Sequence, residues 1–195
     1  LMPNTKILDA PFVIDQGADL GKWSPTNYTN KFYGLSTMRL GLEKSRNLMT
    51  IRLAQMIGIE SIVENAKKLN ISDDISAVLS MALGAGETTL ERLTMAYAML
   101  VNGGKQISPS LIDRVQNRNG KTIEKQDDRL CINCKMETID PSLEPKIIDS
   151  RVQIIDPVHS YQVVSMLEGA VLRGTGKKVS VIKKPLAGKT GTTND

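Results

Sequence analysis

Hydrophobic residues recur with helical spacing over much of residues 36–104. The stretch "IESIVENAKKLNI" (59–71) places five apolar side chains on one stripe of a helix, with polar residues on the other side. Two shorter stretches precede it, "TMRLGLEK" (37–44) and "RNLMTIRLAQMIG" (46–58), and Gly58 is typical of a helix end. We therefore predict three successive helices, and the apolar stripe of the third consists of Ile59, Ile62, Val63, Ala66 and Leu69.

Two later stretches have the same spacing. "TTLERLTMAYAMLVNGG" (88–104) begins with Thr88-x-x-Glu91, the spacing of a capping box, and ends in two glycines. "DPVHSYQVVSMLEGAVLRGTG" (156–176) is predicted to be the last long helix. The side chains expected in the core are Met81, Met95 and Met99 on the earlier segments and Val163, Val164, Leu167 and Val171 on the last helix.

The remaining segments favour loops and short strands. Residues 1–34 are rich in Pro, Asn, Asp and Gly and show no sustained period, which indicates extended loop with short strands. Residues 105–125 alternate, and Asn119-Gly120 predicts the turn of a β-hairpin. Residues 126–150 are polar and irregular, and we expect an inserted loop there.

Composition narrows the classes of function. With 195 residues, 41% apolar and 24% charged, the chain is long enough for a domain with its own core. A net charge of +4, dispersed lysines and arginines and 4% aromatic residues argue against nucleic acid as a partner. No apolar run approaches the roughly 20 residues that span a bilayer. The stretch "LMPNTKILDAPF" lacks the pattern of a signal peptide.

The two cysteines are close together, in Cys131-Ile-Asn-Cys134. A structural zinc site would need a second such pair or nearby histidines. The only histidine, His159, is far away in sequence and is expected to be a surface or capping residue at a helix start. We expect a local disulfide if the compartment is oxidising, with zinc binding or thioredoxin-like chemistry as alternatives. We assign no metal ligands and no cofactor.

Other candidate chemistry is weak. Asp73-Asp74 and Asp127-Asp128 lie in polar turns, where carboxylates are usually solvated or cap a helix. The stretches "GAGE" and "RGTG" match no nucleotide-binding pattern. A single histidine also leaves few routes to a Ser-His-Asp or Cys-His centre.

Two short motifs remain, "SRN" (45–47) and "KTG" (189–191). Ser-x-Asn followed by Lys-Thr-Gly occurs in β-lactamases and penicillin-binding proteins. Lys189 is predicted to lie on a short strand from Leu186, where a cation beside hydroxyl donors could hold a carboxylate. Taken singly, Ser45 could instead be a helix N-cap, Asn47 could bond its own backbone, and Lys189 could be a solvated charge.

Longer blocks extend this match over nearly the whole chain. The blocks are "WSPTNY" (23–28), "YGLSTMRLGLEKSRNLMTIRLAQMIGI" (33–59), "ALGAGETTLERLTMAYAMLVNGG" (82–104), "DPVHSYQVVSMLEGAVLRGTG" (156–176) and "AGKTGTTND" (187–195). Through these blocks the chain resembles the transpeptidase domain of class A (bifunctional) penicillin-binding proteins, and within them the 1A type of Gram-negative bacteria. The "CINC" loop is the part least like that pattern.

The resemblance implies an α+β fold, that of the penicillin-binding protein and serine β-lactamase transpeptidases. In that family a serine attacks a D-Ala-D-Ala peptide, releases D-alanine and passes the acyl group to an amine of a second stem peptide. β-Lactams mimic the donor and leave the serine acylated. For residues 1–195 we expect a partial, mostly helical domain with a truncated antiparallel sheet and the inserted loop at 126–150.

The resemblance also implies roles for individual residues. Ser45 would relay a proton to the departing amine, Asn47 would hydrogen-bond the substrate backbone, and Lys189 would tune the relay and attract the terminal carboxylate. The substrate-binding residues would be Thr190 and Thr192, whose hydroxyls bind the carboxylate, and Gly191, which lets substrate lie close; the Thr192 N–H would also supply half of the oxyanion hole.

The family's nucleophile belongs to a Ser-x-x-Lys motif ahead of Ser-x-Asn. The one such spacing in this chain is Ser180-Val-Ile-Lys183, which follows Ser45 and is expected to be a chance match. We therefore expect the nucleophile segment before residue 1 and the last strands after residue 195. The isolated chain is expected to be inactive, because losing a covalent nucleophile removes most of the catalysis.

The resemblance further implies a parent protein with a glycosyltransferase domain and a membrane anchor, on the periplasmic side of the bacterial inner membrane. Its partners would be the peptidoglycan pentapeptide donor, the acceptor stem peptide and β-lactam antibiotics. Two alternatives stay open at this point: a non-catalytic remnant or peptide-binding module of the same fold, and a Cys-x-x-Cys metal or nucleic-acid protein.

Overall fold

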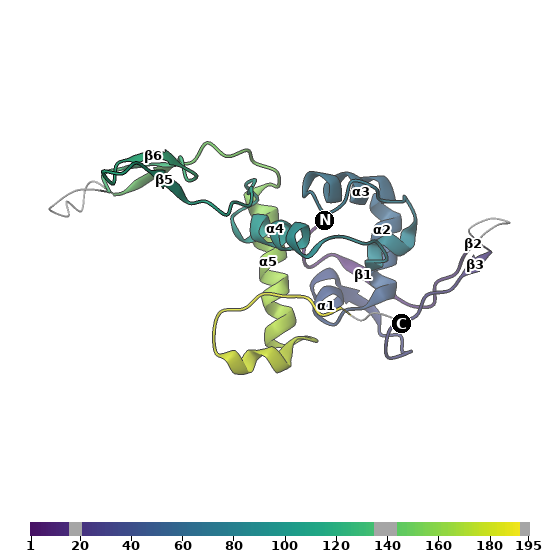
Figure 1. Cartoon of the computed structure of the whole chain (residues 1–195). Helices are drawn as coiled ribbons and strands as arrows, with labels where there is room; N and C mark the ends of the chain where they lie inside the picture. The colour runs from purple at the N-terminus through teal and green to yellow at the C-terminus, as the bar shows by residue number, and fades with distance from the viewer. Residues whose placement is uncertain (16–20, 135–143, 192–195) are drawn as a thin grey trace.

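Five helices form the body of the protein in the computed structural model, which describes residues 1–15, 21–134 and 144–191. The long helix α5 crosses the body, and α1 and α4 pack against it (Figure 1). α2 packs against α1 and α3 on the other side. All five predicted helices are confirmed: α1 (Met38–Glu43), α2 (Asn47–Ile57), α3 (Ile59–Lys68), α4 (Leu90–Val101) and α5 (Pro157–Leu172).

The apolar stripe of α3 faces its neighbours, as its spacing predicts. The stripe positions are all half-buried, whereas the charged positions between them are exposed. α3 contacts α2 and the 3-10 helix η1 (Leu79–Leu83) but contains no fully buried residue. Gly58, at φ +84°, separates α2 from α3, so this glycine ends one helix where the sequence predicts it.

One predicted helix cap is wrong by a single residue. The N-cap of α4 is Thr89, whose hydroxyl accepts from the Arg92 N–H at 3.2 Å. Thr88 is instead held by the preceding loop, since its hydroxyl donates to the Ile71 carbonyl. At α5 the carboxylate of Asp156 accepts from the N–H of Val158 at 2.8 Å and, more weakly, of His159. His159 is an exposed residue at a helix start, as predicted.

The strands pair in four separate two-stranded antiparallel sheets among the described residues. β1 pairs with β4 along its whole length, from Lys6 opposite Thr37 to Asp9 opposite Gly34, and packs on α2. The pairs are β1 (Lys6–Asp9) with β4 (Gly34–Thr37), β2 (Ile14–Asp15) with β3 (Lys22–Trp23), β5 (Arg114–Gln116) with β6 (Thr122–Lys125), and β7 (Leu130–Ile132) with β8 (Lys146–Ile148).

The strand predicted from Leu186 is wrong. Residues 185–191 have no regular secondary structure and belong to no sheet, because no strand in the described part of the chain pairs with them. They follow the second 3-10 helix, η2 (Lys177–Ile182), and return along α5, where the Gly188 N–H donates to the Leu167 carbonyl at 3.2 Å. This return brings the KTG motif back to the helical body (Figure 1).

The core lies where α2 meets the N-terminal strands. Phe12, Leu48 and Ile51 form one buried cluster, with Ile14, Trp23 and Leu79 packed against it. A second buried group follows α5 and includes Leu167 and Val171, two of its predicted core residues. Of the predicted core methionines, Met99 is buried, and Met81 and Met95 are half-buried.

An arm made of β5, β6, β7 and β8 extends away from the helices (Figure 1). The predicted hairpin is confirmed: the Gly120 N–H donates to the Asn117 carbonyl at 2.9 Å, and Gly120 has a φ of +78°. The segment 126–150, predicted as an irregular loop, contains β7 and β8 in its described part. Every strand residue of the arm is exposed.

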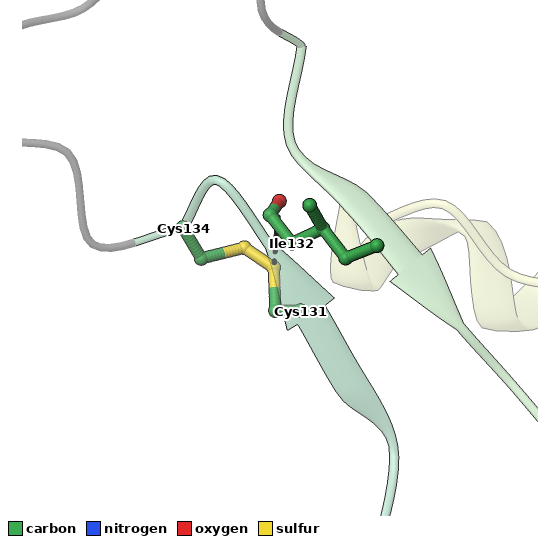
Figure 2. The surroundings of a disulfide bond; sticks show 3 residues. All are labelled: Cys131, Ile132 and Cys134. Atoms are coloured by element: carbon green, nitrogen blue, oxygen red, sulfur yellow. Dashed lines mark hydrogen bonds between the residues drawn. A yellow bond between two sulfur atoms is a disulfide. The ribbon is translucent and has the colours of Figure 1, made fainter.

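Cys131 and Cys134 are joined by a disulfide at the end of β7 (Figure 2). The link closes a ring within one turn of the chain, beside the exposed β7–β8 pair. The expected local pairing of the two cysteines is therefore the arrangement that the structure has.

Candidate active site

A cavity of about 420 Å³ opens between α1, α2, η1 and the returning segment 185–191. Its floor is apolar, and its polar groups come from three places: the turn between α1 and α2, the start of α2, and the KTG motif. The structure therefore brings both sequence motifs to one hollow. The residues that line it include Met38, Leu42, Ser45, Asn47, Met49, Leu53, Ala82, Leu83, Met166, Lys189 and Thr190.

Ser45 lies in the tight turn between α1 and α2. Its backbone has a φ of +53°, and its N–H donates to the Leu42 carbonyl at 3.1 Å. The N-cap of α2 is Arg46, so Ser45 does not cap the helix. Its hydroxyl instead accepts a hydrogen bond from Lys189 Nζ at 2.6 Å. A left-handed serine is uncommon and costs backbone free energy, so this turn is held by its surroundings.

Asn47 begins α2 and is anchored to a distant loop. Its side-chain amide donates to the Thr26 carbonyl at 3.0 Å. The buried side chain of Asn27 accepts from the N–H of Leu48 at 3.3 Å and donates to Asp9 at 2.8 Å. The first turn of α2 is thus capped by a residue of the N-terminal loop, and Asn47 is not bonded to its own backbone.

Arg46, the middle residue of the SRN motif, points away from the cavity. Its guanidinium lies 3.9 Å from the ring centroid of Tyr33 and 3.7 Å from the carboxylate of Asp9, which is fully buried. It also donates to the Ser36 hydroxyl at 3.1 Å. Arg46 therefore anchors the turn through its contacts on the side away from the cavity, while its neighbours Ser45 and Asn47 line the cavity.

Lys189 reaches the cavity from the returning segment. Besides Ser45, its ammonium group contacts the Thr190 carbonyl at 2.7 Å. Burial lowers the pKa of Lys189, because an ammonium group loses hydration in the hollow. The hydroxyl and the carbonyl that Lys189 contacts are both neutral, so neither balances the charge of its ammonium group. In the described part of the chain, this cation can therefore attract an anionic ligand in the cavity.

The other KTG residues flank Lys189. Thr190 lines the cavity, and its hydroxyl lies 2.6 Å from the hydroxyl of Thr175. Gly191 has open space where a side chain would be. Thr192, the last residue with a predicted role, lies outside the described residues.

The one Ser-x-x-Lys spacing in the chain does not reach the cavity. Ser180 on η2 and Lys183 directly after it are exposed, and the Ser180 hydroxyl donates to the Lys177 carbonyl at 2.6 Å. Within the described ranges no three His, Cys, Asp or Glu side chains gather as they would around a metal ion. No helix in those ranges is long and apolar enough to cross a membrane.

The family described as "Penicillin binding protein transpeptidase domain" matches residues 1–195. The chain belongs to this family. Penicillin-binding protein 1A of Rickettsia conorii is 43% identical over 99% of the chain, and the match covers 25% of that relative. This penicillin-binding protein transpeptidase sequence therefore spans about a quarter of the length of the curated relatives that it matches.

Solved structures agree with the assignment to the penicillin-binding protein transpeptidases. Penicillin-binding protein 1A from Haemophilus influenzae matches all of the chain and 32% of its own, with a TM-score of 0.82 and 28% identity. The D,D-transpeptidase domain of a peptidoglycan glycosyltransferase from Eggerthella lenta matches all of the chain and 49% of its own, with a TM-score of 0.70 and 19% identity. The fold is thus the predicted α+β transpeptidase fold.

Sequence reasoning missed the groups that hold the transpeptidase cavity in shape. Glu43, Thr26 and Asn27 were given no role, although they lie within the blocks 23–28 and 33–59 of the family resemblance. The structure buries Glu43, two residues before Ser45, and carboxylates are rarely buried without a charge partner. Which residue is that partner depends on tertiary structure.

Proposed function

We propose that the protein containing this chain is a D-Ala-D-Ala transpeptidase that cross-links peptidoglycan and is acylated by β-lactams. The observation that carries the proposal is the 2.6 Å contact between Lys189 Nζ and Ser45 Oγ, which joins two motifs 144 residues apart within one cavity. A cation, a hydroxyl and an apolar floor suit a short peptide with a terminal carboxylate.

The reaction that we propose is acyl transfer through a serine ester. A serine attacks the carbonyl between two D-alanines, the terminal D-alanine leaves as the amine, and an amine of a second stem peptide takes the acyl group. Ser45 accepts from the Lys189 ammonium, so its own proton is directed away from Lys189 and is available to the leaving amine. Ser45 is reprotonated by the proton that the attacking serine gives up, so the proton count balances, and the Lys189 cation tunes this relay electrostatically.

Substrate binding is assigned to the KTG residues and Asn47. Thr190 and Thr192 donate to the terminal carboxylate beside the Lys189 cation, and Gly191 lets the peptide approach the backbone. The Thr192 N–H would also complete an oxyanion hole. The second side-chain amide hydrogen of Asn47 is oriented by the bond of the amide to Thr26 and is assigned to the substrate backbone.

We propose that the nucleophile comes from a Ser-x-x-Lys motif outside residues 1–195. Support comes from Ser180-Val-Ile-Lys183, the one such spacing in this sequence, which lies on exposed η2. The parent protein is further proposed to carry a glycosyltransferase domain and a membrane anchor and to act on the periplasmic side of the inner membrane. The donor pentapeptide and the acceptor stem peptide are its proposed partners.

Two variants test the relay in the full-length protein that carries this chain. Ser45→Ala is expected to slow acylation by a fluorescent penicillin by about 10²-fold or more, the lower end of general acid–base contributions. Ser180→Ala is the matched control and is expected to acylate normally. An unchanged rate for Ser45→Ala removes the relay role, and loss of acylation in Ser180→Ala makes the η2 serine the nucleophile.

The alternative function is peptide binding without chemistry. The observation in its favour is that the cavity presents binding groups while the chain's own Ser-x-x-Lys lies outside it. Saturable binding of a D-Ala-D-Ala peptide by the chain, with no covalent penicillin adduct by mass spectrometry, is expected for residues 1–195 alone. The same result for the full-length protein would favour a non-catalytic module over a transpeptidase.

A further inference from the structure

The segment "RGTG" (173–176) follows α5 and has no role in the site described so far. It nevertheless touches the KTG motif, since the hydroxyls of Thr175 and Thr190 lie 2.6 Å apart. Thr190 lines the cavity, whereas Thr175 is exposed and is not one of the lining residues. A hydroxyl that contacts a cavity-lining hydroxyl from outside the cavity can set the direction in which the lining hydroxyl points its proton.

Thr175 and the next residue are held by main-chain hydrogen bonds to α1 and α5. The Thr175 N–H donates to the Glu43 carbonyl at 3.1 Å, and the next N–H, of Gly176, donates to the Ala170 carbonyl at 2.9 Å. At Gly174 a Cβ atom would overlap the Glu43 carbonyl, so glycine is required there for the close approach. The backbone on both sides of Thr175 is thus fixed, and the position of its hydroxyl depends on one torsion.

The same anchor also holds Ser45. Glu43 is 2% exposed, and its carboxylate accepts two hydrogen bonds from Arg173, at 2.9 and 2.5 Å. Lys44, the neighbour of Ser45, donates from its side chain to the Arg173 carbonyl at 2.6 Å. The Glu43–Arg173 ion pair, whose carboxylate is buried, therefore positions both residues: Ser45 through the turn after α1, and Thr175 through the RGTG segment.

A threonine hydroxyl has one proton to donate and can accept two. If Thr190 donates its proton to Thr175, only its oxygen lone pairs face the cavity, and these lone pairs repel a carboxylate. If Thr175 donates to Thr190, the Thr190 proton is left for the ligand. A carboxylate ligand selects the second arrangement, since it accepts but cannot donate.

We propose that Thr175 is a positioning residue that donates to Thr190 Oγ1 and thereby directs the Thr190 proton toward the terminal carboxylate of the bound peptide. This inference rests on the proposed function, because it assigns the carboxylate of that substrate as the ligand. Thr175 acts through Thr190 and does not touch the peptide itself.

The test compares two ligands and three variants of the chain. The ligands are an N-acylated D-Ala-D-Ala peptide and the same peptide with a C-terminal carboxamide, titrated by NMR. Thr175→Val keeps the shape and removes the hydroxyl, whereas Thr175→Ser keeps the hydroxyl. Thr94→Val, at an exposed threonine of α4 whose hydroxyl donates to the Leu90 carbonyl, is the control for a general threonine-to-valine effect.

We expect Thr175→Val to bind the carboxylate peptide at least about tenfold more weakly, the lower end of the contribution of one hydrogen bond to a charged group. Its affinity for the carboxamide is expected to stay unchanged, and Thr175→Ser and Thr94→Val are expected to behave as wild type. Equal losses for both ligands, or no loss, overturn the role of Thr175 and leave the proposed function standing. A wild-type chain that binds the carboxylate no better than the carboxamide overturns both.

Discussion

Replacing Glu43 by glutamine tests whether the ion pair between Glu43 and Arg173 stabilises the fold. The carboxylate of Glu43 is almost fully buried and binds the guanidinium of Arg173 through two hydrogen bonds, with Arg39 3.7 Å away. Glutamine keeps the shape but presents an N–H₂ group to one guanidinium N–H, so one bond becomes a contact between two donors.

The magnitude follows from the burial of the two partners. Removing one member of a fully buried pair costs about 3–5 kcal/mol. Arg173, however, has a side chain that is 55% exposed, so its guanidinium regains water when the pair is broken. One hydrogen bond to the amide oxygen also survives. We therefore expect Glu43→Gln to lower the free energy of unfolding by about 2 kcal/mol, the size of one charged hydrogen bond. For a chain of this length that lowers Tm by about 4–8 °C.

Thermal and urea unfolding followed by circular dichroism at 222 nm measure this change. Glu64→Gln, at an exposed position of α3, is the matched control and should shift the free energy by less than about 0.5 kcal/mol. In a double-mutant cycle with Arg173→Gln, the two losses should not add, because they remove the same interaction. A Glu43→Gln protein as stable as wild type, or additive losses in the cycle, would refute the reasoning.

Two further predictions concern Lys189 and Gly104. Because burial lowers the pKa of Lys189 below 10.5, the unfolded chain binds more protons at this residue than the folded chain between the lowered pKa and 10.5. The free energy of unfolding should rise with pH across that window, and Lys189→Met, followed by urea unfolding from pH 8 to 11, should lack this rise; an identical slope in both proteins contradicts the assignment. Gly104→Ala should lower the free energy of unfolding by about 3 kcal/mol or more, because a Cβ at φ +82° would overlap the Ile155 carbonyl and the buried Ser160 hydroxyl. Gly120→Ala, at φ +78° with open space around it, should cost only the left-handed backbone, about 1–2 kcal/mol, and equal losses at both glycines would rule out the steric part.

The helices could be predicted because their signals are local. The spacing of Ile59, Ile62 and Val63 and the glycine at position 58 lie within a few residues of each other, and the structure has the expected helices. The hairpin at Asn119-Gly120 has a local signal of the same kind. The SRN and KTG motifs could also be recognised in the sequence, and in the structure they line one cavity.

The interactions that hold the site could not be predicted in the same way. Asn27 caps α2 by accepting from the N–H of Leu48, 21 residues further along the chain, and Glu43 binds Arg173 across 130 residues. Neither pairing can be predicted from the spacing of residues in the sequence. The spacing to Glu91 favours Thr88 as the cap, but the Thr88 hydroxyl donates to the loop carbonyl of Ile71, and Thr89 caps the helix instead. The predicted strand at Leu186 failed for a related reason: extended backbone becomes a strand only beside a partner.

The exposed β5–β8 arm is thermodynamically insulated from the cavity. Its strands have their extensive contacts with each other, β5 with β6 and β7 with β8. The polar links to the body lie at its base, where Lys105 pairs with Asp149 at 3.0 Å and Arg151 reaches Asn102 at 3.4 Å. A unit joined in this way can unfold locally, with a free energy of unfolding lower than that of the helical body. Substitutions within the arm, including those in the disulfide ring, should therefore change the stability of the arm and leave the positions of the side chains around Ser45 unchanged.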